Sequence, residues 1–122
     1  MFEDVLMSFM HEPGVELVVI ADESGLVVEH SGKTNVPKDT LDGFSAYSKV
    51  ISDTLERVAT DLLGERNVST LQTILELDRH VVVMSKAPRS HMVILVLGSK
   101  DVNIGMLRLL LRDAVRKIDE RV

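Results

Sequence analysis

The chain has 122 residues, of which 45% are hydrophobic and 27% are charged, and this length and composition are typical of one globular domain spanning residues 1–122. Its net charge of −5 argues against nucleic acid or an anionic membrane as the partner, and one Tyr, three Phe and no Trp leave little for base stacking. The absence of cysteine excludes disulfides, thiolate chemistry and sulfur-ligated metal sites.

The first third of the chain predicts a short helix followed by a β-hairpin. Apolar residues recur at helical spacing over residues 2–10. Two apolar runs, 15–21 and 26–28, then flank the turn Asp22–Gly25, in which the Asp side chain can cap the turn and Gly can take a positive φ. We expect the second strand to end by Gly32.

A long amphipathic helix is predicted over residues 39–63. Its apolar stripe repeats at spacings of three and four residues, as in a heptad pattern, and Gly64 follows as a stop signal. The stripe consists of Leu41, Phe44, Ser48, Ile51, Leu55, Val58 and Leu62. Because Tyr47, Val50 and Leu63 widen it, the stripe could face the protein's own core alone or be shared with a partner helix.

The rest of the chain predicts three strands and a terminal helix. Residues 68–77 alternate between apolar and polar side chains, as in a half-buried strand, and residues 80–84 form a more buried one. Every side chain from Met92 to Leu97 is apolar, so this strand needs cover on both faces and belongs in the middle of the sheet. Helical periodicity returns from Ile104 to Ile118. Since short turns join most strands, we expect an α+β fold with a largely antiparallel sheet.

No catalytic or metal site is predicted. Ser31-Gly32-Lys33-Thr34 resembles the end of a phosphate-binding loop, but Val27 stands where the motif needs its first glycine. The four histidines lack metal-site spacing and no carboxylate pair indicates a cleft, so we predict no metal, no cofactor and no enzyme. Arg108, Arg112 and Arg116 share one face of the last helix, which is typical either of an acid-binding stripe or of cations near a helix C-terminus.

The start of the chain lacks the features of a secretory signal. Its first ten residues contain two acidic residues and no Lys or Arg, whereas a signal peptide begins with positive charge. No apolar run approaches the roughly 18 residues that a membrane helix requires. We therefore expect a cytoplasmic protein.

Three segments together resemble the Roadblock/LC7 family, which includes the bacterial MglB proteins. They are Gly14–Val19, the turn with its following residues Asp22–Val27, and Leu97-Gly98 followed by Asp101–Arg108. The resemblance implies a five-stranded antiparallel sheet in the order 2-1-5-4-3. It also implies that the long helix covers one face and the two other helices the opposite face, in a layered architecture like that of profilin and longin domains.

The resemblance further implies a homodimer. Family members pair the edge strand, here residues 68–77, across a two-fold axis and place the two long helices side by side. This arrangement would protect an otherwise exposed edge and would use the surplus apolar flank of the long helix. The interface residues expected on this basis are Phe44, Tyr47, Ile51, Leu55, Val58, Leu71, Thr73 and Leu75.

The partner implied by the resemblance is a Ras-like small GTPase. The expected contact surface is the polar side of the long helix, with Asp42, Lys49, Asp53, Glu56 and Arg57. Hydrolysis could be stimulated by Arg57, the only arginine in this helix, or by holding the GTPase's own residues in place, which we favour. Alternatives are a structural light-chain-like adaptor and a small-molecule-sensing domain with a pocket near Ser31–Thr34 or the arginine stripe. The segment His30–Lys38 fits no family pattern.

Overall fold

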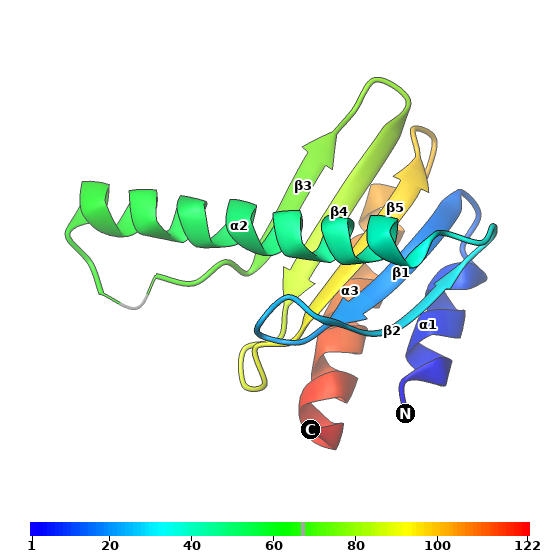
Figure 1. Cartoon of the computed structure of the whole chain (residues 1–122), viewed down its shortest axis with the longest axis horizontal. Helices are drawn as coiled ribbons and strands as arrows, with labels where there is room; N and C mark the ends of the chain where they lie inside the picture. The colour runs from blue at the N-terminus through cyan, green and yellow to red at the C-terminus, as the bar shows by residue number, and fades with distance from the viewer. Residues whose placement is uncertain (67) are drawn as a thin grey trace.

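The computed structural model describes residues 1–66 and 68–122 and contains three helices and one sheet (Figure 1). The five strands are antiparallel and lie in the order β2-β1-β5-β4-β3, which confirms the predicted topology. Helices α1 and α3 cover one face and α2 crosses the other (Figure 1). The elements are α1 Glu3–Met10, β1 Val15–Ala21, β2 Val27–Gly32, α2 Lys38–Leu63, β3 Gln72–Glu76, β4 His80–Lys86, β5 Val93–Ser99 and α3 Ile104–Arg121.

Strand β5 is the centre of the sheet, as its continuous apolar sequence predicts. It pairs with β1 on one side and with β4 on the other. Ile94 and Val96 belong to the core beneath α1 and α3, whereas Leu95 belongs to the smaller core beneath α2. All three side chains are buried because each face of this strand has its own helical cover.

The β1–β2 turn follows the predicted chemistry. One carboxylate oxygen of Asp22 accepts hydrogen bonds from the backbone N–H groups of Ser24 and Leu26 at 2.9 and 3.0 Å, and from the Ser24 hydroxyl. Gly25 has φ +90°. The Ser24 hydroxyl and these backbone donors lower the pKa of Asp22, since they stabilise its charged form. Strand β2 ends at Gly32, as expected.

The two ends of the chain are tied to the folded body. The Arg121 guanidinium at the end of α3 forms two hydrogen bonds with the Asp4 carboxylate of α1, at 2.7 and 2.6 Å. The Phe2 backbone N–H donates to Glu29 on β2 at 3.1 Å, and the chain's amino group lies 3.0 Å from the same carboxylate. Figure 1 shows both termini on the same side of the molecule.

The edge strand differs from its prediction. A strand over residues 68–77 was expected, but β3 spans only Gln72–Glu76. The predicted half-burial is also absent from the described protomer: Ile74 and Leu75 point to opposite faces yet are 40% and 39% exposed. The physical reason is position, because β3 has a strand neighbour on one side only and contributes no residue to either described core cluster.

Candidate functional site

The C-terminal half of α2 carries an apolar surface that the rest of the described chain does not cover. Figure 1 shows this half of the helix extending past β3, beyond the edge of the sheet. Ile51, where the uncovered part of the stripe begins, is 37% exposed, and Leu62, near the helix end, is 80% exposed. The other exposed apolar residues of the helix are Tyr47, Val50, Leu55, Val58 and Leu63.

The N-terminal half of α2 packs on the sheet instead. Leu41 is buried with Leu17 and Leu95, and Phe44 packs partly buried against the same cluster. Phe44, expected at a dimer interface, therefore packs partly buried against the chain's own core. The first half of the apolar stripe therefore faces the core, whereas the second half is exposed. That a partner helix covers the second half stays a prediction.

The exposed half of α2 lies beside an unpaired strand edge. Strand β3 pairs with β4 alone, so the backbone groups along its outer edge have no strand partner in the described protomer. Thr73 and Leu75 pair with Met84 and Val82, which lie on the sheet face that α2 covers. Leu71, just before the strand, is 72% exposed. The three β3-side residues predicted for a dimer thus lie at this free edge.

Polar contacts fix α2 against the start of β3. The Glu56 carboxylate accepts a hydrogen bond from the Thr70 backbone N–H at 2.6 Å and lies 3.6 Å from the Lys86 ammonium. The Ser52 hydroxyl bonds to the Thr70 hydroxyl at 2.8 Å. Only 17% of the Glu56 side chain is exposed. Glu56 was expected on a partner-binding surface, but the structure places it between the helix and the sheet.

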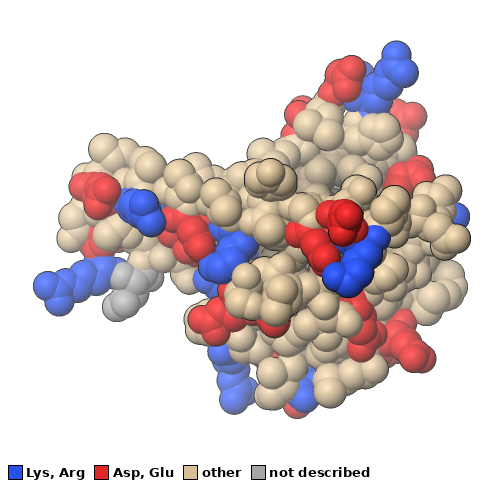
Figure 2. Space-filling view, in the orientation of Figure 1, with Lys and Arg blue, Asp and Glu red and all other residues tan. Residues whose placement is uncertain are grey.

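The other residues expected to bind a partner are at least partly exposed, and two of them, Lys49 and Asp53, line a cavity under α2. Asp42 pairs with Lys38 at 2.8 Å and Lys49 pairs with Asp53 at 2.7 Å, both one helical turn apart. The hydrogen bond to Asp42 raises the pKa of Lys38, since it stabilises the ammonium form. Arg57 is exposed. Figure 2 shows positive and negative side chains interspersed over this helix.

The predicted small-molecule pockets are located differently from expectation. Of the phosphate-loop-like segment, Thr34 alone lines an apolar groove of about 450 Å³, with Val36 and Phe44. The hollow beside α3 is lined by Arg116 and not by Arg108 or Arg112. The contacts of Arg116 are with Asp113 and Glu120, at 2.6 and 2.9 Å, so this arginine serves ion pairs within its own helix.

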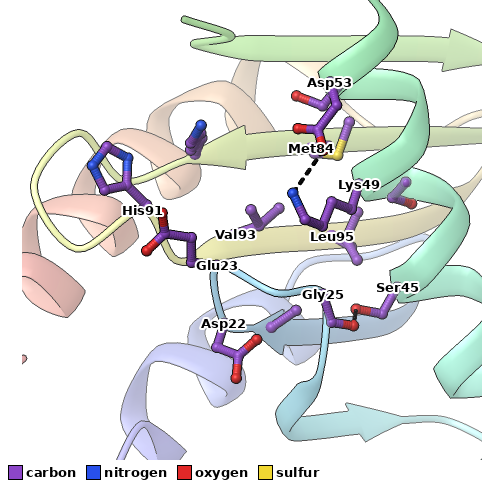
Figure 3. A pocket seen from close by; sticks show the side chains of 14 residues that line it. Asp22, Glu23, Gly25, Ser45, Lys49, Asp53, Met84, His91, Val93 and Leu95 are labelled. Carbon is purple, nitrogen blue, oxygen red and sulfur yellow. Dashed lines mark hydrogen bonds and ion pairs between the residues drawn. The ribbon is translucent and has the colours of Figure 1, made fainter.

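A third cavity lies under the middle of α2 and was not predicted (Figure 3). Lys86 and His91 line it together with Lys49. Their positions in the sequence gave no signal, because they come from β4, the β4–β5 loop and α2 and meet only in the fold. The only available hint was Ser48, a small polar residue in the apolar stripe.

The described part of the chain contains neither a metal-site cluster nor a helix suited to cross a membrane. Within residues 1–66 and 68–122, no group of three His, Asp or Glu side chains is arranged to hold a metal ion. No helix of this described part has the length and apolarity needed to cross a membrane. The feature that stands out is therefore the surface formed by the exposed apolar residues of α2 and the free edge of β3, which we call the α2–β3 surface.

Comparison with known proteins identifies the fold and the family. Three solved structures superpose over most of the chain. A Roadblock/LC7 domain from Streptomyces avermitilis has a TM-score of 0.81 at 20% identity, with 98% of this chain and 95% of that chain covered. Myxococcus xanthus MglB has a TM-score of 0.79 at 17% identity, with 99% and 98% covered. The third, described as MglB with tetrameric arrangement, has a TM-score of 0.77 at 19% identity, with 92% and 80% covered.

The sequence itself carries the assignment to a family. No curated protein matches the chain significantly in sequence. Residues 1–97, which include every strand except the last two residues of β5, match the family model of the Roadblock/LC7 domain. Since this match covers most of the chain and the superposed structures share its fold, the chain belongs to the Roadblock/LC7 domain family.

Proposed function

We propose that this chain is a homodimeric regulatory module that binds a Ras-like small GTPase. The observation that carries the proposal is the α2–β3 surface, where an uncovered apolar helix face lies beside an unpaired strand edge. Family membership supports the regulatory role. A solved structure described as MglB with tetrameric arrangement supports assembly of several copies.

In the proposed dimer, two copies of β3 pair across a two-fold axis and the two α2 helices lie side by side. This pairing would satisfy the outer backbone groups of β3, which are otherwise an aggregation hazard. It would also remove Ile51, Leu55 and Val58 from water, and burying apolar surface contributes roughly 25 cal/mol per Å². A two-fold interface uses the same residues on both copies, so one self-complementary surface is sufficient.

The dimer has a direct test with a matched control. Ile51→Asp would place a charge in the proposed interface, whereas the protomer itself leaves this position partly exposed and should still fold. Val28→Asp makes the same kind of change at an exposed apolar residue of β2, the opposite edge of the sheet. Light scattering should find a dimer for the parent chain and Val28→Asp and a folded monomer for Ile51→Asp. A monomeric parent chain would refute the dimer.

The GTPase would bind the open polar side of α2. Arg57 is exposed there, and Asp42, Lys49 and Asp53 keep more than a third of their side chains exposed, although Lys49 and Asp53 also line the cavity under the helix. The hydrogen bond from Thr70 to Glu56 leaves that carboxylate less accessible. We infer that the dimer acts by holding the GTPase's own catalytic residues in position, because Arg57 is the only arginine that α2 offers.

Hydrolysis measurements separate the possible roles. The GTPase recovered from native extract is loaded with GTP and its hydrolysis is followed with and without the dimer. Faster hydrolysis that survives Arg57→Ala supports positioning of the GTPase's residues. A loss of about 10³-fold or more in Arg57→Ala would instead identify an arginine supplied in trans. Binding without faster hydrolysis would identify an adaptor, and recovery of no GTPase by an intact dimer would contradict the proposal.

A further inference from the structure

The cavity under the middle of α2 has the size of a small organic molecule. It has a volume of about 180 Å³ and lies between α2, the β1–β2 turn and the β4–β5 loop (Figure 3). A cavity of about 150 Å³ is enough to hold benzene. The space exists because α2 presents Ser45 and Ser48 to the sheet, where the preceding turn of the helix presents Leu41.

The floor and the wall of this cavity differ in chemistry. Met84, Val93 and Leu95 form an apolar floor on β4 and β5. Lys49 reaches the cavity from α2 (Figure 3). Lys86 lines it from the end of β4, so two cations approach the space from different elements. A ligand that contacts both lysines and the floor would carry a negative group attached to an apolar one, and it would compete with Asp53, which also lines the cavity beside Lys49.

Neither lysine is held by a strong buried partner. The Lys86 ammonium lies 3.6 Å from the Glu56 carboxylate, which is longer than a charge-assisted hydrogen bond. Lys49 contacts Asp53 at 2.7 Å, but Asp53 is 48% exposed and exposed pairs contribute little to stability. A ligand carboxylate could therefore replace the present partner of either ammonium group at a small cost in free energy.

The carboxylates on the opposite side do not reverse this preference. Asp22 already accepts from the backbone N–H groups of Ser24 and Leu26, so its charge is committed to the turn. Glu23, which also lines the cavity, is exposed to solvent. Lys86 is the more buried of the two lysines, since only 22% of its side chain is exposed, compared with 39% for Lys49.

The rim of the cavity is held in a strained and fixed conformation. His91 has φ +62°, the only positive φ outside glycine among the described residues. Its loop is clamped by Asp119 of α3, which accepts hydrogen bonds from the backbone N–H groups of Arg89 and Ser90 at 3.0 and 2.8 Å. Such strain persists only where surrounding contacts enforce it, and it is concentrated at functional sites. The site is therefore formed before any ligand arrives.

We propose that this cavity binds a small organic monoanion, a carboxylate attached to a compact apolar group. Its carboxylate contacts Lys86 and Lys49, and its apolar part lies on Met84, Val93 and Leu95. The apolar floor disfavours inorganic phosphate, which would leave its oxygens without donors there. The cavity lies within one copy of the chain and its test uses no GTPase, although Lys49 is also among the residues proposed to contact the GTPase.

Benzoate and 4-methylpentanoate are the probes, and two-dimensional NMR of the full chain is the measurement. Each should shift the backbone signals of Ser48, Val93 and His91 with a Kd of about 1 mM or tighter. Benzamide, which has the same shape without the charge, should bind at least about tenfold more weakly. Inorganic phosphate should cause no shifts at these residues.

Matched variants locate the charge. Lys86→Met keeps the length of the side chain and should weaken benzoate binding by about tenfold or more. Lys49→Met, at a more exposed helix position, gives a second variant should Lys86→Met fold poorly. Lys33→Met removes an exposed lysine outside the cavity and should leave the affinity for benzoate unchanged.

Several results would overturn the proposal. One is the absence of shifts with both carboxylates at about 10 mM. A second is that benzamide binds as tightly as benzoate. A third is that Lys33→Met weakens benzoate binding as much as the cavity variants do. Shifts confined to residues outside the cavity would also count against it.

Discussion

Asn103 begins α3 with a side-chain cap. Its side-chain oxygen accepts a hydrogen bond from the Met106 backbone N–H at 2.9 Å. Asn103→Ala should lower the free energy of unfolding by about 1 kcal/mol, because a helix N–H loses its acceptor. Urea denaturation at a fixed protein concentration measures the difference. Asn35→Ala, in the exposed segment between β2 and α2, is the control, and an equal effect of both substitutions would contradict the capping role.

Gly98 is required by close packing near the end of β5. A Cβ added there would lie 3.0 Å from the Val102 Cγ1 and 3.2 Å from its Cβ, closer than such atoms normally approach. Gly98→Ala should therefore destabilise the protein by about 1–3 kcal/mol. Gly43→Ala is the matched control, since nothing lies within 4 Å of the added atom and alanine favours a helix by about 0.5–1 kcal/mol. Thermal unfolding should therefore move in opposite directions for the two variants.

The ion pair between Asp4 and Arg121 makes stability depend on pH. The Arg121 hydrogen bonds lower the pKa of Asp4, so the folded state binds this proton less readily than the unfolded state does. The contribution is present above the ordinary Asp pKa of about 3.9 and is lost as the pH falls through the lowered value. Asp4→Asn should thus be less stable than the parent chain at pH 7, and the difference should shrink in acid. A difference that is constant across pH would refute the role of the charge.

At the scale of elements, Glu56 acts as the connection between α2 and β3. Glu56→Ala removes the acceptor of the Thr70 N–H, and a hydrogen bond to a charged group contributes about 1.5–3 kcal/mol. Amide hydrogen exchange should accelerate in residues 68–72 and in the last turns of α2. Asp53→Ala, three residues earlier in α2 at a more exposed position, should leave exchange in these residues unchanged. If Glu56→Ala left amide exchange unchanged but weakened GTPase binding, Glu56 would instead be part of the partner-binding surface, as the sequence predicted.

The limits of prediction are clearest in α2. The heptad pattern located the helix and its end at Gly64, but it could not say which half faces the core. That division follows from geometry. The 26 residues of α2 give a helix about 39 Å long, whereas a sheet of five strands is about 20 Å wide, so the helix extends beyond the sheet it crosses. The contact between Glu56 and Thr70 joins residues 14 apart, and no local pattern encodes it.

The strands show the same division between local and long-range information. The continuous apolar sequence of β5 predicted its central place, because burial on both faces leaves a pattern in the strand itself. The alternation over residues 68–77 predicted a strand, but not that only Gln72–Glu76 would pair. The ends of β3 depend on β4, because β3 pairs only with the β4 residues from Val81 to Ser85.

At the scale of the whole molecule, the proposed dimer makes stability depend on concentration. If unfolding separates two copies, the Tm of the parent chain should rise as the protein concentration is raised, because mass action favours the associated native state. Ile51→Asp should show a lower Tm that is independent of concentration, since the α2–β3 surface would no longer associate. Val28→Asp, at the opposite edge of the sheet, should keep the concentration dependence of the parent chain. Differential scanning calorimetry of the parent chain and both variants over about a hundredfold range of concentration tests these expectations. A parent Tm that does not change with concentration would mean that the exposed face of α2 and the edge of β3 have a partner other than a second copy of this chain.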